Sequence, residues 1–332
     1  MMTASVNRRK VVVVGAGAVG ATFAYSLAQS GLADEIAIID RNESLARGQV
    51  MDLVHGQPYF PSVSIHVGDL SDYANAQLIV ITAGAAQRPG ETRLQLLKKN
   101  AAVVRAVVTE VMDQQSSAVM LVVTNPVDVM TDLALKFTGW DRHRILGSGT
   151  VLDSARLRYL LSAHCGVDVH NVHGYILGEH GDTEFAAWSM THIGGMQIEA
   201  FCPNCGHCAD WRAARSQIVQ QVRDSAYHII DYKGTTCFAV GLALVRITSA
   251  ILRSQNSVLT VSTMLNGEYG LQDVCLSVPC IVSAKGVDKV VENRLPEDEL
   301  AALHASAAVL KQATDQLAAE IITCDWKREI AG

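Results

Sequence analysis

The sequence predicts an α/β protein with a doubly wound parallel sheet in its first half and a mixed α/β unit in its second. Three observations support this fold class. The chain has 332 residues, 49% hydrophobic and 18% charged, which suits about two domains with apolar cores. Residues 1–148 alternate short β-branched runs with helical patterns, as stacked βαβ units do. Residues 149–332 contain longer helical patterns and fewer strand-like runs.

Apolar runs in residues 1–148 predict strands that are buried on both faces of a sheet, because such strands do not alternate apolar and polar residues. The predicted strands are Val11–Val14, Glu35–Asp40, Ser64–Val67, Leu78–Thr82 and Val119–Thr124. The helical patterns between them are Val19–Ser30, Leu45–Leu53 and Leu94–Met112.

Residues 149–332 form the second predicted domain. Its predicted strands are His170–Leu177, Val258–Leu265 and Val274–Val282, and its predicted helices are Asp210–Lys233, Ala239–Leu252 and Pro296–Ile322. Proline followed by three acidic residues is typical of a helix start, since both suit the first turn. Because no flexible linker separates the halves, we expect the two domains to pack closely around a cleft.

Composition restricts the class of partner. The net charge is -6, from 27 basic and 33 acidic residues, and no long basic run occurs. This balance argues against nucleic acid or an anionic membrane as a partner. The most apolar stretch, Phe238–Leu252, is too short to span a bilayer and contains Arg246. The apolar run Val11–Val14 is too short for a signal peptide, so we expect a cytoplasmic protein that acts on small molecules.

The first predicted strand runs into a glycine motif, Gly15-Ala16-Gly17-Ala18-Val19-Gly20, that opens a helix. In the G-x-G-x-x-G pattern, the first glycine permits a tight turn, the second lets the backbone approach a pyrophosphate, and the third lets helix and strand pack closely. Asp40 ends the second strand 20 residues later, where a carboxylate binds ribose hydroxyls and repels a 2′-phosphate. The pattern predicts a Rossmann-type domain that binds NAD, although Arg41 leaves some use of NADP open.

Four further segments carry residues capable of chemistry. His180 lies between glycine-containing turns in Gly178–Asp182, and Asp153 and Arg156 share one face of a predicted helix. Residues 84–93 follow a strand and contain a Pro-Gly turn, as a lid over a ligand does. Residues 124–128 end a strand at the edge where open α/β sheets bind ligands. Taken alone, each has an ordinary structural interpretation: a packed histidine, an ion pair, an exposed loop and an Asn-Pro turn.

Together these motifs resemble the NAD-dependent L-lactate dehydrogenase branch of the lactate/malate dehydrogenase family. The resemblance extends from about Lys10 to about Ile322, with GAGAVG, AAQRPGETRL, TNPVD, GSGTVLDSARLR, NVHGYILGEHGDTE and KGTT in the family's order. It implies a Rossmann domain followed by a mixed α/β substrate domain, a homotetramer, and interconversion of pyruvate and L-lactate. Malate dehydrogenase, a broader 2-hydroxy-acid dehydrogenase and a non-catalytic NAD sensor are the alternatives.

The resemblance also implies roles for individual residues. The implied catalytic residues are His180 as proton donor and acceptor, Asp153 as its partner, and Arg93 as the group that stabilises charge on the carbonyl oxygen. The implied substrate-binding residues are Gln87, Arg93, Asn125, Arg156 and Thr236. The implied cofactor-binding residues are Gly15, Gly17, Val19, Gly20, Asp40, Gly84, Ala85, Thr124 and Asn125.

Substrate choice and regulation rest on three positions of the resemblance. Gln87 matches the lid position at which lactate dehydrogenases have glutamine and malate dehydrogenases have arginine, because oxaloacetate carries a second carboxylate. A one-residue slip of the lid would place Arg88 there instead. Arg158 and His173 match the residues with which many bacterial members bind fructose 1,6-bisphosphate across a subunit interface. Their ordinary interpretation is a surface salt bridge and a packed histidine.

The chain has eight cysteines. In a reducing compartment we interpret five as buried thiols: Cys165, Cys237, Cys275, Cys280 and Cys324. The other three, Cys202, Cys205 and Cys208, form a C-x2-C-x2-C pattern that includes His207, and the family does not explain this stretch. A metal site, a redox-labile disulfide and a metal-free loop all stay open for it, with an exposed metal-free loop favoured. We therefore assign no metal.

Overall fold

The computed structural model describes residues 8–85, 93–206 and 210–323. Its strands are β1 (Lys10–Val14), β2 (Glu35–Ile39), β3 (Ser64–Val67), β4 (Leu78–Ile81), β5 (Val119–Val122), β6 (Ile145–Gly147), β7 (Val172–His173), β8 (Ile176–Leu177), β9 (Phe185–Ala186), β10 (His192–Ile193), β11 (Met196–Gln197), β12 (Ser257–Asn266), β13 (Gln272–Ser283) and β14 (Gly286–Val290). Its α-helices are α1 (Ala18–Ser30), α2 (Glu43–His55), α3 (Arg93–Asp113), α4 (Val127–Thr138), α5 (Val151–Cys165), α6 (Ile198–Phe201), α7 (Trp211–Lys233), α8 (Phe238–Leu252) and α9 (Glu297–Thr323).

One nine-stranded sheet organises the molecule, in the order β14-β13-β12-β6-β5-β4-β1-β2-β3. Strands β1 to β6 are parallel, and the order 3-2-1-4-5-6 is that of a Rossmann sheet. β12 continues the sheet antiparallel to β6, through a single paired position. The predicted α/β fold with a doubly wound parallel sheet is confirmed.

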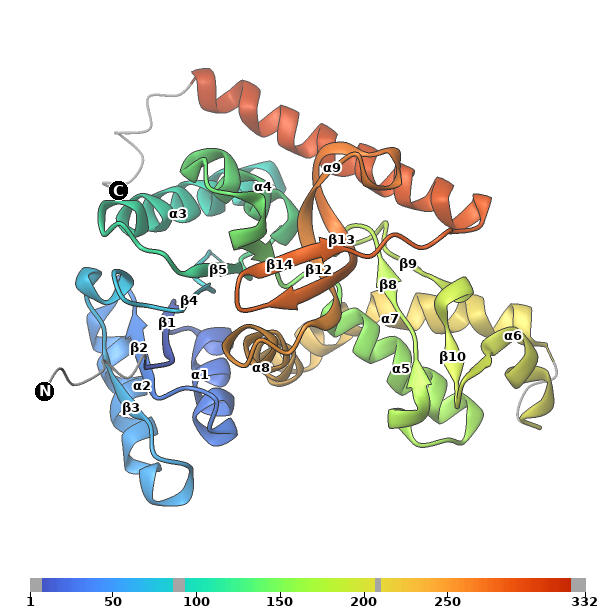
Figure 1. The fold of residues 1–332 in the computed structure, drawn as a ribbon, viewed down its shortest axis with the longest axis horizontal. Coiled ribbons are helices and arrows are strands. Elements are labelled where there is room, and N and C mark those ends of the chain that lie inside the picture. Colours follow the sequence, from blue (N-terminus) through green and yellow to red (C-terminus); the bar gives the residue numbers. More distant parts are fainter. Residues whose placement is uncertain (1–7, 86–92, 207–209, 324–332) are drawn as a thin grey trace, which may run out of the picture.

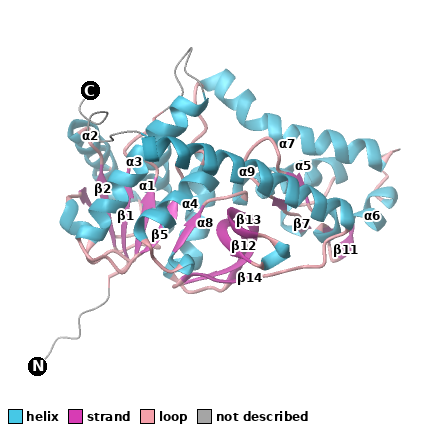
Figure 2. Cartoon of the chain, turned by 90° about the horizontal axis from the view of Figure 1, so that it is seen from above, coloured by secondary structure: helices cyan, strands magenta, loops and turns pink. Residues whose placement is uncertain are grey.

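Helices cover both faces of this sheet. In Figure 1, α3 and α4 lie above the parallel strands and α1 and α8 lie below them, and each pair is in contact. α9 extends over the top, where it contacts α3, α4 and β13 (Figures 1 and 2). The strands between these layers are almost fully buried, which explains their lack of polar alternation.

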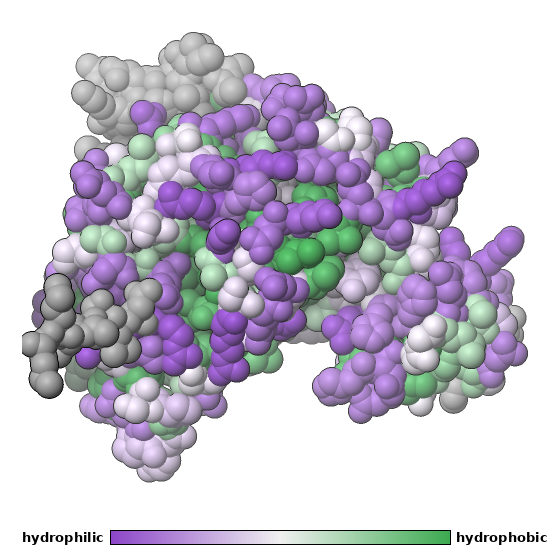
Figure 3. Space-filling view, viewed as in Figure 1, coloured by the Kyte–Doolittle hydropathy of each residue, from purple (hydrophilic) through white to green (hydrophobic). Residues whose placement is uncertain are grey.

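The second half adds a smaller apolar core beyond the sheet. Residues of α5, α7, β7, β10 and the segment around Cys202 form this core, which is separate from the main one. Figure 3 shows a mostly hydrophilic face with apolar side chains gathered near its middle, around the antiparallel strands. Among the described residues, no helix combines the length and hydrophobicity needed to cross a membrane.

Three expectations differ from the structure. β6 and α4 were not predicted: β6 has only three residues, and α4 follows the strand-end motif directly and buries ten of its 12 residues, among them the polar Asp128 and Asp132. The single strand predicted over His170–Leu177 is instead a 3₁₀ turn followed by two short strands, β7 and β8. The exposed loop predicted around Cys202 is wrong at that residue, which begins a 3₁₀ turn and is fully buried.

The boundary between the two predicted domains, 148/149, falls between β6 and α5. The strands β12 to β14 nevertheless belong to the same sheet as the first half. The segment before α5 is bonded to this sheet, because the Ser148 amide donates to the Val122 carbonyl and the Thr150 amide donates to the Thr260 carbonyl.

Candidate active site

The glycine motif forms a tight turn between β1 and α1. Gly15 has φ +107°, which an L side chain rarely adopts, and a Cβ on Gly20 would lie 1.9 Å from the carbonyl oxygen of Gly15. Gly17 is exposed at the N-cap of α1, and a Cβ there would meet no atom within 4 Å. Open space beside a helix N-terminus is what a pyrophosphate needs, so the turn fits a bound dinucleotide. Val19 lies half-buried in the first turn of this helix.

Asp40 follows β2 and lies against the same turn. Its Oδ2 accepts a hydrogen bond of 2.7 Å from the amide of Ala16, and its Oδ1 accepts one of 2.8 Å from the amide of Asn42. These bonds hold the carboxylate half-exposed beside the glycine turn, at the place where the ribose of a dinucleotide is bound in this fold.

The ends of β4 and β5 are joined by Asn100, a buried residue of α3 that lies outside every sequence motif. Its Oδ1 accepts a hydrogen bond of 2.7 Å from the amide of Ala85, and its Nδ2 donates one of 2.8 Å to the carbonyl of Asn125. Thr124 donates from Oγ1 to the carbonyl of Ala83 at 2.6 Å. Gly84 packs so closely that a Cβ there would lie 2.7 Å from the Thr124 methyl.

These bonds hold the segments after β4 and β5 together beside the glycine turn. Parallel strands share one carboxyl edge, so the predicted cofactor residues converge there. The strand order reverses between β1 and β4, which is where dinucleotides bind in doubly wound sheets. The described residues at this edge fit NAD.

His180, Asp153 and Arg156 lie together. His180 follows β8, and the other two lie on the first turns of α5. The imidazole Nδ1 is 2.6 Å from Asp153 Oδ2, and Arg156 Nη1 donates to Asp153 Oδ1 at 2.6 Å. Asp153 is 1% exposed, whereas the His180 side chain is 26% exposed. A buried carboxylate therefore orients a histidine whose other nitrogen can face a ligand.

The neighbouring charges favour the imidazolium form of His180. Burial alone would lower the pKa of the ring, but the charge and hydrogen bond of Asp153, with smaller contributions from Glu184 and Asp128, raise it to about 9. Burial acts to raise the pKa of the Asp153 carboxyl, yet His180 and Arg156 together hold it below its ordinary value. The geometry thus holds a proton on the imidazole at neutral pH.

Two buried acids beside His180 were missed as site residues. Asp128, in the first turn of α4, accepts a hydrogen bond of 2.8 Å from the His180 amide, and burial raises the pKa of its carboxyl to about 6. Burial, with the charge of Asp153, raises the pKa of Glu184 to about 8. Asp128 ends the motif TNPVD and Glu184 ends the motif NVHGYILGEHGDTE, so both motifs were a signal, although neither shows that the carboxyl is buried.

The other predicted substrate-binding residues lie in different segments of the chain. Gln87 lies outside the described residues, and Arg93 is the first residue of α3. Thr236 is half-buried in the turn between α7 and α8. Asn125 is exposed at the end of β5.

Arg158 and His173 lie close together on the other side of α5. Arg158 Nε donates a hydrogen bond of 2.8 Å to the carbonyl of Val172, the residue before His173. His173 is exposed on β7, and Arg158 is half-buried. The helix turns Arg158 away from Arg156, as the spacing of two residues predicts.

Taken together, this edge of the sheet joins a dinucleotide site to a protonated histidine and an arginine. An imidazolium can donate a proton to a forming alkoxide, and a guanidinium can bind a carboxylate through two parallel hydrogen bonds. The chemistry that fits is hydride transfer to a 2-oxo acid.

Two family models match the sequence. Residues 9–147 match the lactate/malate dehydrogenase NAD-binding domain, and residues 150–321 match the lactate/malate dehydrogenase α/β C-terminal domain. An L-lactate dehydrogenase of Treponema denticola is 58% identical over 312 residues, which cover 94% of this chain and 99% of that protein. An L-lactate dehydrogenase of Acetivibrio thermocellus is 48% identical, with 92% and 96% covered.

Solved structures agree with these sequence matches. A lactate dehydrogenase from a Medee basin deep-sea metagenome library has a TM-score of 0.91 and 40% identity, with 94% of this chain and 99% of that chain covered. The minor L-lactate dehydrogenase of Enterococcus mundtii, in a ligand-bound form, has a TM-score of 0.90 and 39% identity, with 93% and 98% covered.

Proposed function

This chain belongs to the lactate/malate dehydrogenase family, and we propose that it is an L-lactate dehydrogenase whose proton is carried by His180. It is an NAD-dependent oxidoreductase, and its reaction is the reversible transfer of hydride between NADH and pyruvate that gives L-lactate. The observation that carries the assignment of residues is the contact of 2.6 Å between His180 Nδ1 and Asp153 Oδ2.

When bound, NADH supplies the hydride. His180 donates its Nε2 proton to the forming alkoxide and takes it back in the reverse direction. Asp153 holds Nδ1, which keeps Nε2 directed at the substrate and stabilises the charged ring. Arg156 uses one N–H on Asp153 and binds the substrate carboxylate with others, since a guanidinium has five.

His180→Asn tests the proton role. The amide cannot exchange a proton near neutral pH, so turnover of pyruvate should fall by roughly 10²-fold or more while NADH binding, followed by fluorescence, is kept. Pyruvate turnover within a few-fold of the unchanged enzyme would remove His180 from the mechanism. Loss of NADH binding would point instead to a role in folding.

Arg93 and Gln87 complete the proposed substrate site by the family resemblance. Arg93 stabilises the negative charge that develops on the carbonyl oxygen, and Thr236 and Asn125 border the substrate. Gln87 stands opposite the methyl group of pyruvate, so Gln87→Arg should raise kcat/KM for oxaloacetate relative to pyruvate. An unchanged ratio of the two values of kcat/KM would contradict this assignment.

We propose that Arg158 and His173 bind fructose 1,6-bisphosphate between two copies of the chain. Two-fold symmetry would place two such pairs together, and a bisphosphate would neutralise their charge. The bond from Arg158 to the residue before His173 supports one joint site. Calorimetric titration should detect binding, and no binding at millimolar concentration would rule the site out.

We propose further that the enzyme is a homotetramer in the cytoplasm. Three large apolar side chains on the contacting helices α1 and α8 are more than half exposed: Tyr25 (54%), Phe238 (70%) and Leu242 (63%). A second copy of the chain would cover them. The buried thiols of Cys237, Cys275 and Cys280 suit a reducing compartment. Light scattering on the purified chain tests the assembly, and a monomer would contradict it.

A further inference from the structure

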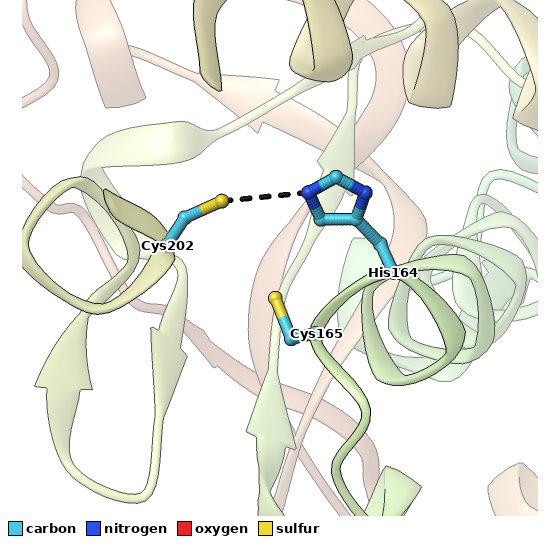
Figure 4. Close-up of side chains that lie close together, drawn as sticks. All are labelled: His164, Cys165 and Cys202. Atoms are coloured by element: carbon cyan, nitrogen blue, oxygen red, sulfur yellow. Dashed lines mark hydrogen bonds between the residues drawn. The ribbon is translucent and has the colours of Figure 1, made fainter. Parts of the chain in front are cut away.

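Outside the active site, three side chains with metal-binding atoms meet at the end of α5. His164 and Cys165 are the last two residues of that helix, and Cys202 begins the turn after α6. Their ligand atoms all lie within 4.8 Å of one another. Figure 4 shows the imidazole and both sulfurs directed toward a common point. We propose that His164, Cys165 and Cys202 bind a structural zinc ion.

The spacing of the donor atoms suits tetrahedral zinc. With Zn–S of about 2.3 Å and Zn–N of about 2.0–2.1 Å, a tetrahedral ion holds a sulfur and a nitrogen roughly 3.6 Å apart and two sulfurs about 3.8 Å apart. The Cys202 Sγ and the His164 Nε2 are 3.4 Å apart, although the residues are 38 positions apart in sequence. This distance is close to the one that tetrahedral zinc requires, and the Cys165 Sγ lies within 4.8 Å of both atoms.

The three donors are largely shielded from solvent, which favours a tightly held metal ion over one that exchanges with solvent. Cys165 is 3% exposed and Cys202 is fully buried, and both belong to the smaller apolar core. Two buried thiolates alone would be costly in such a place, but two thiolates, a neutral imidazole and Zn²⁺ sum to zero charge. The carboxyl end of α5 also favours a positive charge nearby. Zinc binding would release the two thiol protons to solvent.

The site is separate from the proposed active site, because Asp153 and Arg156 lie in the first turns of α5 and His180 contacts Asp153 there. Zinc would pin the end of this helix to the segment after α6, two parts of the smaller core. Zinc has no redox chemistry, and three protein ligands leave a fourth position of the tetrahedron for another donor. We therefore expect the ion to act on stability rather than on the chemistry of the reaction.

Metal analysis of the full-length chain tests the proposal. The protein is produced with zinc in the medium, without a histidine tag, and dialysed before elemental analysis. We expect about one zinc per chain in the unchanged protein and less than roughly a fifth of that in His164→Asn and in Cys202→Ser. Cys205→Ser is the matched control, because Cys205 lies three residues after Cys202 and is not one of the three clustered donors. It should keep its zinc.

A zinc-free unchanged protein that takes up no zinc on addition would overturn the proposal, as would full zinc content in Cys202→Ser. If the variants fail to fold, Co²⁺ titration of the unchanged apo-protein and of apo-Cys205→Ser still decides, because Cys205→Ser breaks the C-x2-C-x2-C pattern and keeps the three clustered donors. Tetrahedral Co²⁺ with thiolate ligands should give visible bands and sulfur-to-metal charge-transfer bands that saturate at about one equivalent. No such bands, or a Cys165–Cys202 disulfide found by mass spectrometry of the purified protein, would also overturn it.

Discussion

Asp153→Asn isolates the charge that holds the proton on His180. In the unchanged protein, the pKa of His180 lies at about 9, compared with an ordinary value of 6.5. At about 1.4 kcal/mol per unit, this difference amounts to roughly 3 kcal/mol in favour of the imidazolium. The amide removes the charge of Asp153 but leaves the burial that lowers the pKa, so the pKa of His180 should fall to roughly 6.5 or below.

The rate effect follows from the protonated fraction. At about pH 7.5, roughly 97% of the histidine is protonated with a pKa of 9, but only about 10% with a pKa of 6.5. Protonation alone therefore costs roughly tenfold in kcat/KM for pyruvate, and loss of the correct tautomer brings the total to the order of 10².

The assay is the pH dependence of kcat/KM for pyruvate reduction, which reports groups of the free enzyme. Because the proposed reduction step uses the imidazolium of His180, the rate should fall as pH rises through about 9 in the unchanged enzyme. In Asp153→Asn this fall should move down by two units or more. Asp168→Asn, which removes an exposed carboxylate, is the control and should keep the original profile. An unmoved profile in Asp153→Asn would refute the reasoning.

Four further variants test the cofactor and effector sites. Gly20→Ala places a Cβ 1.9 Å from the Gly15 carbonyl and should lower the free energy of unfolding in urea by about 1–3 kcal/mol. In Gly17→Ala the new Cβ meets no atom within 4 Å, so the free energy of unfolding should change by less than about 0.5 kcal/mol. Equal losses of stability in the two variants would contradict the packing role of Gly20. Asn100→Ala leaves the amide of Ala85 and the carbonyl of Asn125 without their hydrogen-bond partner. NADH binding, measured by fluorescence titration, should weaken by roughly tenfold. Unchanged affinity would show that these bonds do not position the cofactor loops. Arg158→Gln should abolish any lowering of the pyruvate KM by fructose 1,6-bisphosphate, and a retained effect would place that effector elsewhere.

Most of the parallel sheet was predictable from the sequence because its strands are buried on both faces. The runs Val11–Val14 and Leu78–Thr82 differ from β1 and β4 by one residue each. β6 was not predicted because its three residues, between Arg144 and Ser148, are too few to show the pattern of a strand. The prediction of one strand over His170–Leu177 was wrong because its apolar residues belong to two short strands. β7 pairs with β10, and β8 pairs with β9.

The site was predictable where a motif marked it and not where burial alone defines it. The spacing of Asp153 and Arg156 on one helix predicted that they share a face. In the structure, the Arg156 guanidinium donates a hydrogen bond to the Asp153 carboxylate. Asn100 lies outside every motif, and Glu184 ends the motif NVHGYILGEHGDTE without any sign that it is buried; tertiary packing buries both side chains. His164 and Cys165 were not grouped with Cys202 because the fold, not their spacing, brings them together.

The central claim is tested most directly by kcat/KM for pyruvate against kcat/KM for oxaloacetate in the same NADH oxidation assay. We expect NADH-dependent formation of L-lactate, with pyruvate preferred by roughly tenfold or more, because the proposed role of Gln87 leaves the second carboxylate of oxaloacetate without a cation. A preference for oxaloacetate, or no oxidation of NADH with either substrate, would contradict it.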